Sequence, residues 1–349
     1  MPRRQVVIAQ SIQYSITNRE KKPPLVHKLP AYFYTYWLTF ECVRADLFKA
    51  LRGTWEVNED AYLSSFQGRD ALEPMGDMGY SGSTFFHTKN SNYLVKSIPR
   101  SFEHTFFRDD LMLPYARYMQ ANPSSLLVRI TDFLQCVQYS IGTILGLAPS
   151  HHIVMENLLY GKSEDIRENG EGESVWEQYD LKPMSYFYPE RDVAGGVLTS
   201  EATKSKLADD FNEKIMLTLD DAEDFMLQLE KDTKLLSDSN AVDYSLFLVR
   251  IPTEGGFSAD PKPTQETPLV PPEAPSWRTG VKSADGKWIY RASILDFFWA
   301  KHKVHAKAMT GLINTYNAVD HKGPMSVTTE APEYRQRFLK MCKEMIENR

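Results

Sequence analysis

A chain of 349 residues, 42% of them hydrophobic and 12% aromatic, is long enough for one large domain or for two lobes that each bury a core. Its formal net charge of −6 argues against a whole-molecule attraction to nucleic acid or anionic lipid and leaves only local basic patches for such binding. Cys42, Cys136 and Cys342 lie far apart without a CxxC pair, which argues against a disulfide framework and a structural zinc site. We expect a reducing compartment.

The N-terminus, MPRRQVVIAQSIQYS, begins with basic residues but lacks the apolar core and cleavage site of a secretory signal. No run of about 18 apolar residues occurs in the sequence, so we expect a soluble or peripheral protein. Residues 1–30 are weakly patterned and close with KKPPLVHKLP, a proline-punctuated stretch typical of an extended connection. We therefore expect regular structure to begin only after residue 30.

Residues 31–160 predict a lobe of sheet and helix. Leu47, Leu51 and Trp55 lie at helical intervals, and Asn58 precedes a second helical turn. The stretch 79–97, GYSGSTFFHTKNSNYLVKS, predicts a β-hairpin with a small-residue turn at one end and the ammonium of Lys96 in its second strand. A helix pattern follows over 102–119, and LLVRITDFLQCVQYSIG and HHIVMENLLYG predict strands.

Residues 161–349 predict a second, mixed lobe. Strand patterns occur in WEQYDLKPMS, VDYSLFLVRIP and GKWIYRASILDFF, and helical patterns occur over 219–239 and 331–349. The segment 252–282 holds six prolines between Pro261 and Pro275, so we expect a disordered or extended insertion that interrupts a hairpin.

Four charged elements lie at the edges of apolar strands: the turn 79–83 with Lys96, then YDLK, VDYS and ILDFF. Transfer of a phosphoryl group from ATP needs backbone N–H groups and a lysine for the phosphates, carboxylates for Mg²⁺, an acid that orients the attacking hydroxyl and a further cation. Each element alone also has a purely structural explanation, since such turns close hairpins and strand-end aspartates cap the next element. Adjacent His151 and His152 point to opposite faces of a strand, so we assign them to structure.

Taken together, these segments resemble the phosphatidylinositol phosphate kinase family. The resemblance spans roughly residues 35–342 outside the insertion and includes NPSSLLVRI, YDLKPMS, DYSL, ILDFF and PEYRQRF. It implies an α+β fold of two lobes, distantly like a protein kinase, with antiparallel sheets flanked by helices and with ATP between the lobes. The implied divisions are an N-terminal extension at 1–30, an N-lobe at 31–160 and a C-lobe at 161–349.

The resemblance assigns ATP to the hairpin and to the segment that connects the lobes. Lys96 would bind the nucleotide phosphates, Glu103 would pair with that lysine, and the backbone of residues 155–158 would contact the adenine. The implied cofactor-binding residues are Ser81, Gly82, Ser83, Lys96, Glu103, Met155, Glu156, Asn157 and Leu158.

By the same resemblance, Asp243 is the catalytic aspartate near the inositol hydroxyl, and Asp296 is the Mg²⁺ ligand. Lys182 would contact the transferring phosphoryl group, and Asp180 would hold that lysine in place. The cofactors implied are ATP and Mg²⁺, and positioning with charge neutralisation would carry the reaction.

After Asp296 the family has a loop that reads the lipid headgroup and presents lysines to the membrane. Here Lys301, Lys303 and Lys307 lie in that stretch, and residues 301–322 contain four lysines against one aspartate. Arg191 corresponds by type to an arginine that often follows the DLK motif. The implied partners are a phosphatidylinositol monophosphate and an anionic membrane surface, with no nucleic acid and with a homodimer left open; the implied location is cytoplasmic, peripheral at the cytosolic face of a membrane.

The sequence departs from the family at Pro183 and Met184, where Gly-Ser usually follows DLK, and Pro183 has no backbone N–H to donate to a phosphate. We rank phosphatidylinositol 4-phosphate 5-kinase activity first, because it is the commonest assignment for a stand-alone family domain. A phosphatidylinositol 3-phosphate 5-kinase-like activity, a catalytically weak phosphoinositide-binding scaffold and a soluble inositol phosphate kinase remain as alternatives. The lysine-rich segment after Asp296 speaks against the last.

Overall fold

The computed structural model describes residues 3–18, 38–68, 70–75, 83–137, 143, 148–162, 176–183, 211–253, 276–300 and 330–348. The chain divides into two compact units. The first comprises Met1–Arg100, Val128–Ser174 and Asp260–Ala274, and the second comprises Ser101–Leu127, Val175–Ala259 and Pro275–Arg349.

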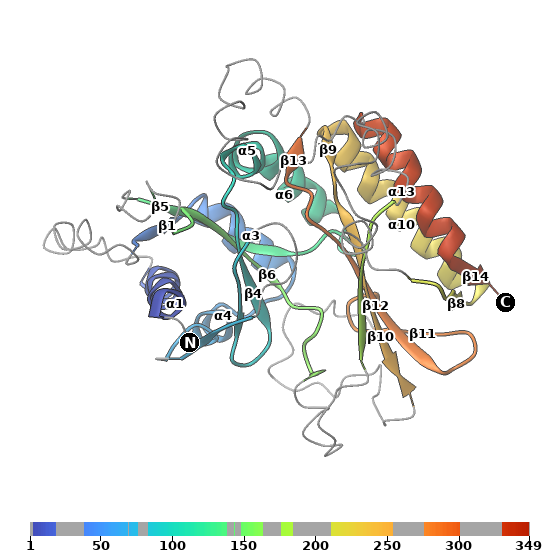
Figure 1. Ribbon diagram of the computed structural model, residues 1–349, viewed down its shortest axis with the longest axis horizontal. Helices are drawn as coiled ribbons and strands as arrows, with labels where there is room; N and C mark the ends of the chain where they lie inside the picture. Colours follow the sequence, from blue (N-terminus) through green and yellow to red (C-terminus); the bar gives the residue numbers. More distant parts are fainter. Residues whose placement is uncertain are drawn as a thin grey trace, which may run out of the picture. The chain divides into compact units, whose positions relative to one another are not determined.

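The first unit is built on an antiparallel sheet that has six strands among the described residues (Figure 1). In spatial order the strands are β1 (Phe40–Cys42), β5 (Ile130–Cys136), β6 (His151–Glu156), β4 (Tyr93–Ser97), β3 (Phe85–Thr88) and β2 (Leu72–Pro74). The predicted hairpin is confirmed, since β3 pairs with β4 and Phe85 lies opposite Lys96. The strands predicted on either side of residue 143 are β5 and β6.

Helix α1 (Arg3–Thr17) corrects the expectation that regular structure begins only after residue 30. Its apolar face buries Ile8, Ile12 and Ile16, and the helix contacts both edge strands, β1 and β2. The hydroxyl of Ser11 accepts a hydrogen bond from the Leu38 amide, and the hydroxyl of Ser15 accepts one from the Phe40 amide, both at 3.1 Å. The Ser15 hydroxyl therefore binds an amide of the edge strand β1, which limits pairing with other chains there.

Helices α3 (Ala45–Thr54) and α4 (Glu59–Ser64) follow β1, as the helical spacing predicted. Helix α3 packs on β5 and buries Phe48 and Leu51. Helix α4 is capped by Asn58, whose side chain accepts a hydrogen bond from the Ala61 amide at 2.9 Å. Such a cap satisfies an amide that the first helical turn leaves without a partner.

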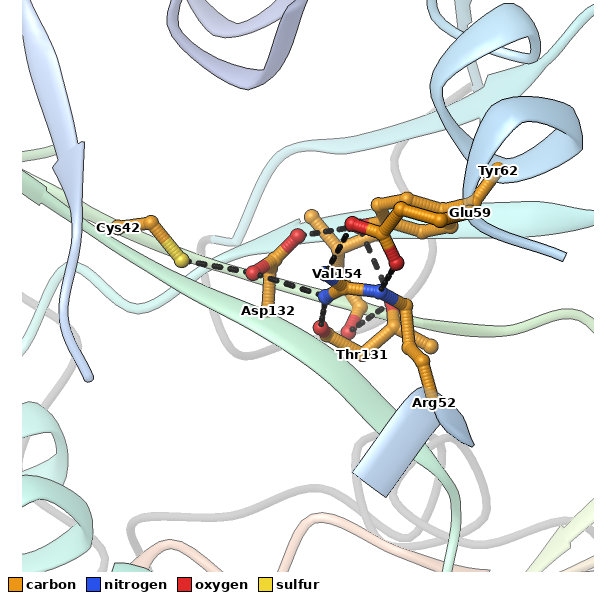
Figure 2. A network of polar contacts seen from close by, with 7 residues as sticks. All are labelled: Cys42, Arg52, Glu59, Tyr62, Thr131, Asp132 and Val154. Carbon is orange, nitrogen blue, oxygen red and sulfur yellow. Dashed lines mark hydrogen bonds and ion pairs between the residues drawn. The ribbon is translucent and has the colours of Figure 1, made fainter. Parts of the chain in front are cut away.

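A buried ionic network connects helices α3 and α4 to strand β5 (Figure 2). The guanidinium of Arg52 on α3 donates to both carboxylate oxygens of Glu59, at 2.8 and 2.6 Å, and to the carbonyl of Thr131 at 2.7 Å. Thr131 lies where the pairing of β5 with β6 shifts register, between Ile130 and Asp132. An irregularity of this kind disrupts the ladder locally, and Arg52 binds the backbone carbonyl at that point.

Asp132 completes this network from the opposite side of Arg52. Its carboxylate is buried, lies 3.3 Å from the Arg52 guanidinium and accepts hydrogen bonds from the Tyr62 hydroxyl and from the thiol of Cys42 (Figure 2). The Arg52 guanidinium also lies over the Tyr62 ring, 4.5 Å from its centroid. Charge, hydrogen bonding and packing are therefore matched at the same place, which is the condition for a buried ion pair to be tolerated.

The second unit contains a four-stranded antiparallel sheet among its described residues, in the order β11 (Val281–Lys282), β12 (Trp288–Leu295), β10 (Ser245–Pro252) and β7 (Glu177–Leu181). The predicted hairpin of β10 and β12 is confirmed by pairing from Ser245 opposite Leu295 to Pro252 opposite Trp288. Two short pairs complete the strands: antiparallel β9 (Ala241–Val242) with β13 (Trp299–Ala300), and parallel β8 (Ile215–Leu217) with β14 (Ile346–Asn348).

The long helices of the second unit are α10 (Leu219–Asp238) and α13 (Ala331–Met345), which lie side by side in Figure 1. Helix α10 buries Ala222, Phe225, Leu229 and Leu236 at helical intervals, in agreement with its predicted apolar face. No described helix is both long and apolar enough to span a bilayer. The mixed α+β class predicted from the sequence is confirmed in both units.

A continuous helical segment consists of α5 (Ser101–Phe106), η2 (Phe107–Leu111), a π-helical turn, and α6 (Met112–Ala121). The sequence boundaries put it in the 31–160 lobe, whereas it packs within the second unit. Phe102 stacks edge-on against Trp299 with centroids 4.5 Å apart, and the Tyr118 hydroxyl donates to Asp232 of α10 at 2.7 Å. These contacts explain why the helical segment belongs to the second unit.

Candidate active site

The strand register of the second unit brings three strand ends together. On β7, Leu181 pairs with Leu246 of β10, and Ser245 of β10 pairs with Leu295 of β12. Lys182 follows Leu181 directly, Asp296 follows Leu295 directly, and Asp243 precedes Ser245 by two residues. Three charged groups that lie far apart in the sequence therefore meet at one end of the sheet.

Lys182 is the centre of this group. Its ammonium donates to Asp243 Oδ1 at 3.0 Å, and the two side chains are only 11% and 12% exposed. Burial by itself lowers the pKa of Lys182, but the negative charges of Asp243, Asp180 and Asp296 and the hydrogen bond that the ammonium donates to Asp243 outweigh it and raise the pKa above its usual value. The lysine is therefore a permanent cation at neutral pH.

The carboxylates around Lys182 outnumber it, since Asp180, Asp243 and Asp296 all act on this one ammonium electrostatically. The local surplus of negative charge suits a divalent cation, and carboxylate oxygens are the ligands that Mg²⁺ prefers. The described residues contain no cluster of three or more His, Cys, Asp or Glu side chains placed to hold a metal by themselves. Because Mg²⁺ in nucleotide sites is bound by one or two carboxylates together with substrate phosphates, this donor set fits it.

Both strand-end aspartates have a strained backbone. The φ angle is 64° at Asp243 and 63° at Asp296, in the left-handed region that most residues other than glycine avoid. Aspartate tolerates this conformation better than most residues, but it is still uncommon and persists where the surrounding structure imposes it. The strain at both positions is typical of a functional site.

The first unit contains the predicted phosphate-binding lysine. Lys96 lies on β4 between Phe85 of β3 and Ile153 of β6, is 6% exposed, and has its ammonium 5.4 Å from the centroid of the Phe85 ring. The neighbouring Ser97 hydroxyl accepts a hydrogen bond from the Thr84 amide at 2.8 Å, which fixes the strand entry after Ser83. Ser81 and Gly82 lie outside the described residues.

The segment predicted to contact the adenine, residues 155–158, spans the end of β6. Its residues Met155, Glu156, Asn157 and Leu158 are all buried. The Glu156 amide donates to the Arg129 carbonyl at 3.0 Å, the Asn157 amide donates to the Asn92 carbonyl at 3.1 Å, and the Glu156 carboxylate accepts from the Arg129 amide. These two amides are therefore engaged within the unit, so the predicted contact to the adenine would have to come from other backbone groups of the segment.

The other predicted site residues are placed as follows. Glu103 lies in the first turn of α5 and belongs to the second unit, whereas Lys96 belongs to the first, so each is described only within its own unit. Asp180 lies on β7 opposite Phe247. The lipid and membrane residues Arg191, Lys301, Lys303 and Lys307 lie outside the described residues, as do residues 254–275 of the proline-rich segment.

The helical pattern over residues 331–349 places Tyr334 on the apolar face of the C-terminal helix and predicts no further role for it. In the structure the Tyr334 hydroxyl donates to the Tyr244 carbonyl, next to Asp243 in the chain. The two residues are 90 positions apart, and no spacing pattern links them. The signal available in the sequence was a tyrosine, with its polar hydroxyl, on a predicted buried helix face, since such hydroxyls usually find a partner.

Comparison with known proteins bears on this site. The family model described as phosphatidylinositol-4-phosphate 5-kinase matches residues 66–269, a range that includes Lys96, Lys182 and Asp243 and ends before Asp296. The chain is 26% identical over 208 residues to phosphatidylinositol 4-phosphate 5-kinase 5 of Arabidopsis thaliana, which covers 58% of this chain and 24% of that protein.

Two further relatives come from other organisms. A probable phosphatidylinositol phosphate kinase of Dictyostelium discoideum is 28% identical over 208 residues, or 58% of this chain and 26% of that protein. Phosphatidylinositol 4-phosphate 5-kinase its3 of Schizosaccharomyces pombe is 26% identical over 145 residues, or 42% of this chain and 17% of the relative. The matched region therefore makes up only 17% to 26% of the length of these three relatives. Because this family model matches more than half of its residues, the chain belongs to the phosphatidylinositol-4-phosphate 5-kinase family.

Proposed function

We propose that the chain is a lipid kinase that transfers the γ-phosphate of ATP to the inositol ring of phosphatidylinositol 4-phosphate, at the 5-hydroxyl. One observation carries this proposal: at the end of the β7–β10–β12 sheet, a permanent lysine cation is set among three carboxylates, two of which belong to left-handed residues. Family membership supports the reaction, and the names of the Arabidopsis and Schizosaccharomyces relatives support the 4-phosphate as the substrate.

The residues of the second unit would divide the chemistry among them. Asp243 would accept a hydrogen bond from the inositol hydroxyl and orient it for attack, while Lys182 would neutralise the charge of the phosphoryl group in transfer. Asp180 would keep Lys182 in place through its negative charge. Asp296 would hold Mg²⁺, which, when bound, offsets the charge of the nucleotide phosphates.

The first unit would provide the rest of the nucleotide site. Lys96 would bind the phosphates of ATP, and the segment 155–158 would lie against the adenine. This division supports a two-lobed, distantly protein-kinase-like arrangement, with the two units as its lobes. Residues 301–322, which have four lysines against one aspartate, would hold the protein peripherally at an anionic membrane on the cytosolic side.

Transfer of labelled phosphate from Mg-ATP to liposomes tests the proposal. Separate liposomes carry the 3-, 4- or 5-monophosphate of phosphatidylinositol, and the wild type is compared with Asp296→Asn and with Asp285→Asn. Asp285 is a matched control, because it is an exposed aspartate of the same unit whose carboxylate binds the Ser283 hydroxyl and the Lys287 amide.

We expect product from the 4-phosphate liposomes, a loss of at least about 100-fold in Asp296→Asn, and wild-type activity in Asp285→Asn. Product from the 3-phosphate liposomes alone would contradict the proposed substrate. No product from any liposome, with the protein folded and bound to the membrane, would refute the kinase proposal and favour a phosphoinositide-binding scaffold. In that case Pro183, which is buried directly after Lys182, is the first residue to replace with glycine.

A further inference from the structure

The link between β9 and β10 consists of only two residues, Asp243 and Tyr244. On one side β9 pairs with β13, where Val242 lies opposite Trp299. On the other side β10 pairs with β12 from Ser245 onward. Asp243 has a left-handed backbone between these two fixed ladders, so its conformation depends on what holds this short link.

The C-terminal helix α13 holds it. The Tyr334 hydroxyl donates a hydrogen bond to the Tyr244 carbonyl, and both residues are fully buried. The Tyr244 ring stacks edge-on against the Tyr334 ring, with centroids 4.7 Å apart, and against the Phe338 ring at 4.9 Å. Polar and aromatic contacts from one helix thus converge on the residue after Asp243.

Helix α13 is itself firmly anchored near this contact. The Arg335 guanidinium donates to the Thr233 hydroxyl at 3.2 Å and to the Glu230 carbonyl at 3.1 Å, both on α10. Tyr334 lies in the first turn, where its amide donates to the Glu330 carbonyl at 2.9 Å. A hydroxyl on a packed helix is a more precise support than one on a loop.

We propose that Tyr334 is a positioning residue for Asp243. It keeps the Asp243 backbone in its left-handed conformation and thereby keeps the Asp243 carboxylate 3.0 Å from the Lys182 ammonium. Helix α13 lies outside the range 66–269 that the family model matches, so this role extends the site to a part of the chain that the family comparison does not reach. The kinetic consequence rests on the lipid kinase activity proposed above. The structural consequence does not.

The test compares Tyr334→Phe with Tyr118→Phe. Both variants remove one tyrosine hydroxyl of the second unit that donates to an acceptor in the same unit, Tyr244 in one case and Asp232 in the other. Both keep the aromatic ring, and Tyr118 has no place in the proposed site. We expect the two variants to lose similar amounts of thermal stability. A difference in their catalytic rates would therefore reflect the position of Asp243 rather than the stability of the fold.

We expect kcat for phosphate transfer to fall about tenfold in Tyr334→Phe, with the KM for ATP unchanged, because the ATP contacts are assigned to other residues. Tyr118→Phe should keep kcat within about twofold of the wild type. Equal kcat values in the two variants would overturn the proposal, as would a rise in the KM for ATP that accounts for the whole loss in Tyr334→Phe.

A second measurement does not depend on catalysis. Hydrogen exchange of a peptide that covers residues 241–247, followed by mass spectrometry, should be faster in Tyr334→Phe than in the wild type and unchanged in Tyr118→Phe. If the wild type transfers no phosphate, the proposed function fails, while this measurement still decides the structural role. Unchanged exchange in Tyr334→Phe would refute it. If Tyr334→Phe does not fold, Phe338→Leu loosens the same Tyr244 ring and takes its place in both measurements.

Discussion

The two units each contain a buried cation beside carboxylates, two around Arg52 and three around Lys182, and the arrangements differ in what else binds the cation. In the first unit Arg52 faces Asp132 and Glu59, and its donors bind fixed carboxylate and carbonyl oxygens (Figure 2). In the second unit Lys182 is outnumbered by Asp180, Asp243 and Asp296. The Arg52 network contains hydroxyl, thiol and backbone partners from three elements, whereas the Lys182 group lies where strands end.

This difference separates a structural ion pair from a site for chemistry. Arginine, with its planar fork, suits a fixed bidentate contact, and lysine, with a single ammonium on a flexible stem, suits contact with a group that comes and goes. The carboxylate surplus and the left-handed aspartates around Lys182 are unfavourable for stability, and such costs occur at functional sites. Substitutions in the two groups should therefore have opposite consequences for stability and activity.

The largest expected effect on stability is in the Arg52 network. Arg52→Met leaves the fully buried Asp132 carboxylate without its cation, so the free energy of unfolding should fall by about 3–5 kcal/mol. Urea denaturation measures it. The double variant Arg52→Met with Asp132→Asn should regain part of the loss, because it no longer buries an unpaired charge. If the free energy of unfolding of Arg52→Met falls by less than about 1 kcal/mol, the Arg52 network is not a stabilising ion pair and the contrast with the Lys182 group is wrong.

A buried histidine of the first unit predicts a pH effect of intermediate size. His152 on β6 is fully buried, with the Phe40 ring edge-on at 5.0 Å, and burial lowers its pKa from 6.5 to about 3. Among the described residues, neither ring nitrogen has a hydrogen-bond partner. The unfolded chain binds the proton as the pH falls below 6.5, and the folded chain does so only near pH 3, so protons favour unfolding in this window.

The contribution of His152 should therefore be complete above pH 6.5 and should decrease as the pH falls toward 3. At pH 5 the loss is about 2 kcal/mol. Denaturant unfolding of the wild type and of His152→Phe between pH 8 and pH 5 measures it as the difference in slope. Parallel curves for the two proteins would show that His152 does not stay neutral on folding.

The smallest expected effect is on the stability of the Asp296→Asn variant. Asparagine tolerates the left-handed backbone at this position, and the change removes one of the three negative charges near Lys182. The free energy of unfolding should stay the same or rise by about 0.5–1 kcal/mol. Urea denaturation of the protein prepared for the activity measurement is sufficient. A decrease in the free energy of unfolding of more than about 2 kcal/mol would show that Asp296, like Asp132, stabilises the fold.

Much of the fold could be predicted from local patterns. The hairpin of β3 and β4 followed from apolar runs around a polar turn, and α10 followed from the spacing of Ala222, Phe225 and Leu229. Helix α1 was not predicted because the prolines after it indicate an extended connection, although Ile8, Ile12 and Ile16 recur at the helical interval of four. Its stability comes largely from tertiary contacts with β1 and β2, which propensity alone does not indicate.

The candidate site could be predicted in its residue types but not in its geometry. The DLK, DYS and ILD segments were identified by resemblance, yet the meeting of Lys182 with Asp243 depends on the register of β7 on β10, which no single segment encodes. The engagement of the Glu156 and Asn157 amides depends in the same way on Arg129 and Asn92, which are distant in sequence. Pairing between remote strands is a property of the whole sheet.

The hairpin of β10 and β12 also has a consequence for protein engineering. Beyond the last paired residues, the Thr253 amide donates to the Lys287 carbonyl at 2.9 Å and the Thr253 hydroxyl donates to the Gly286 carbonyl at 2.8 Å, so the strands are joined independently of the sequence between them. The Asp243 and Asp296 end of the hairpin lies at the far end of this pairing. A reporter domain or an affinity tag inserted between Thr253 and Ser276 should thus leave the spacing of the two aspartates unchanged.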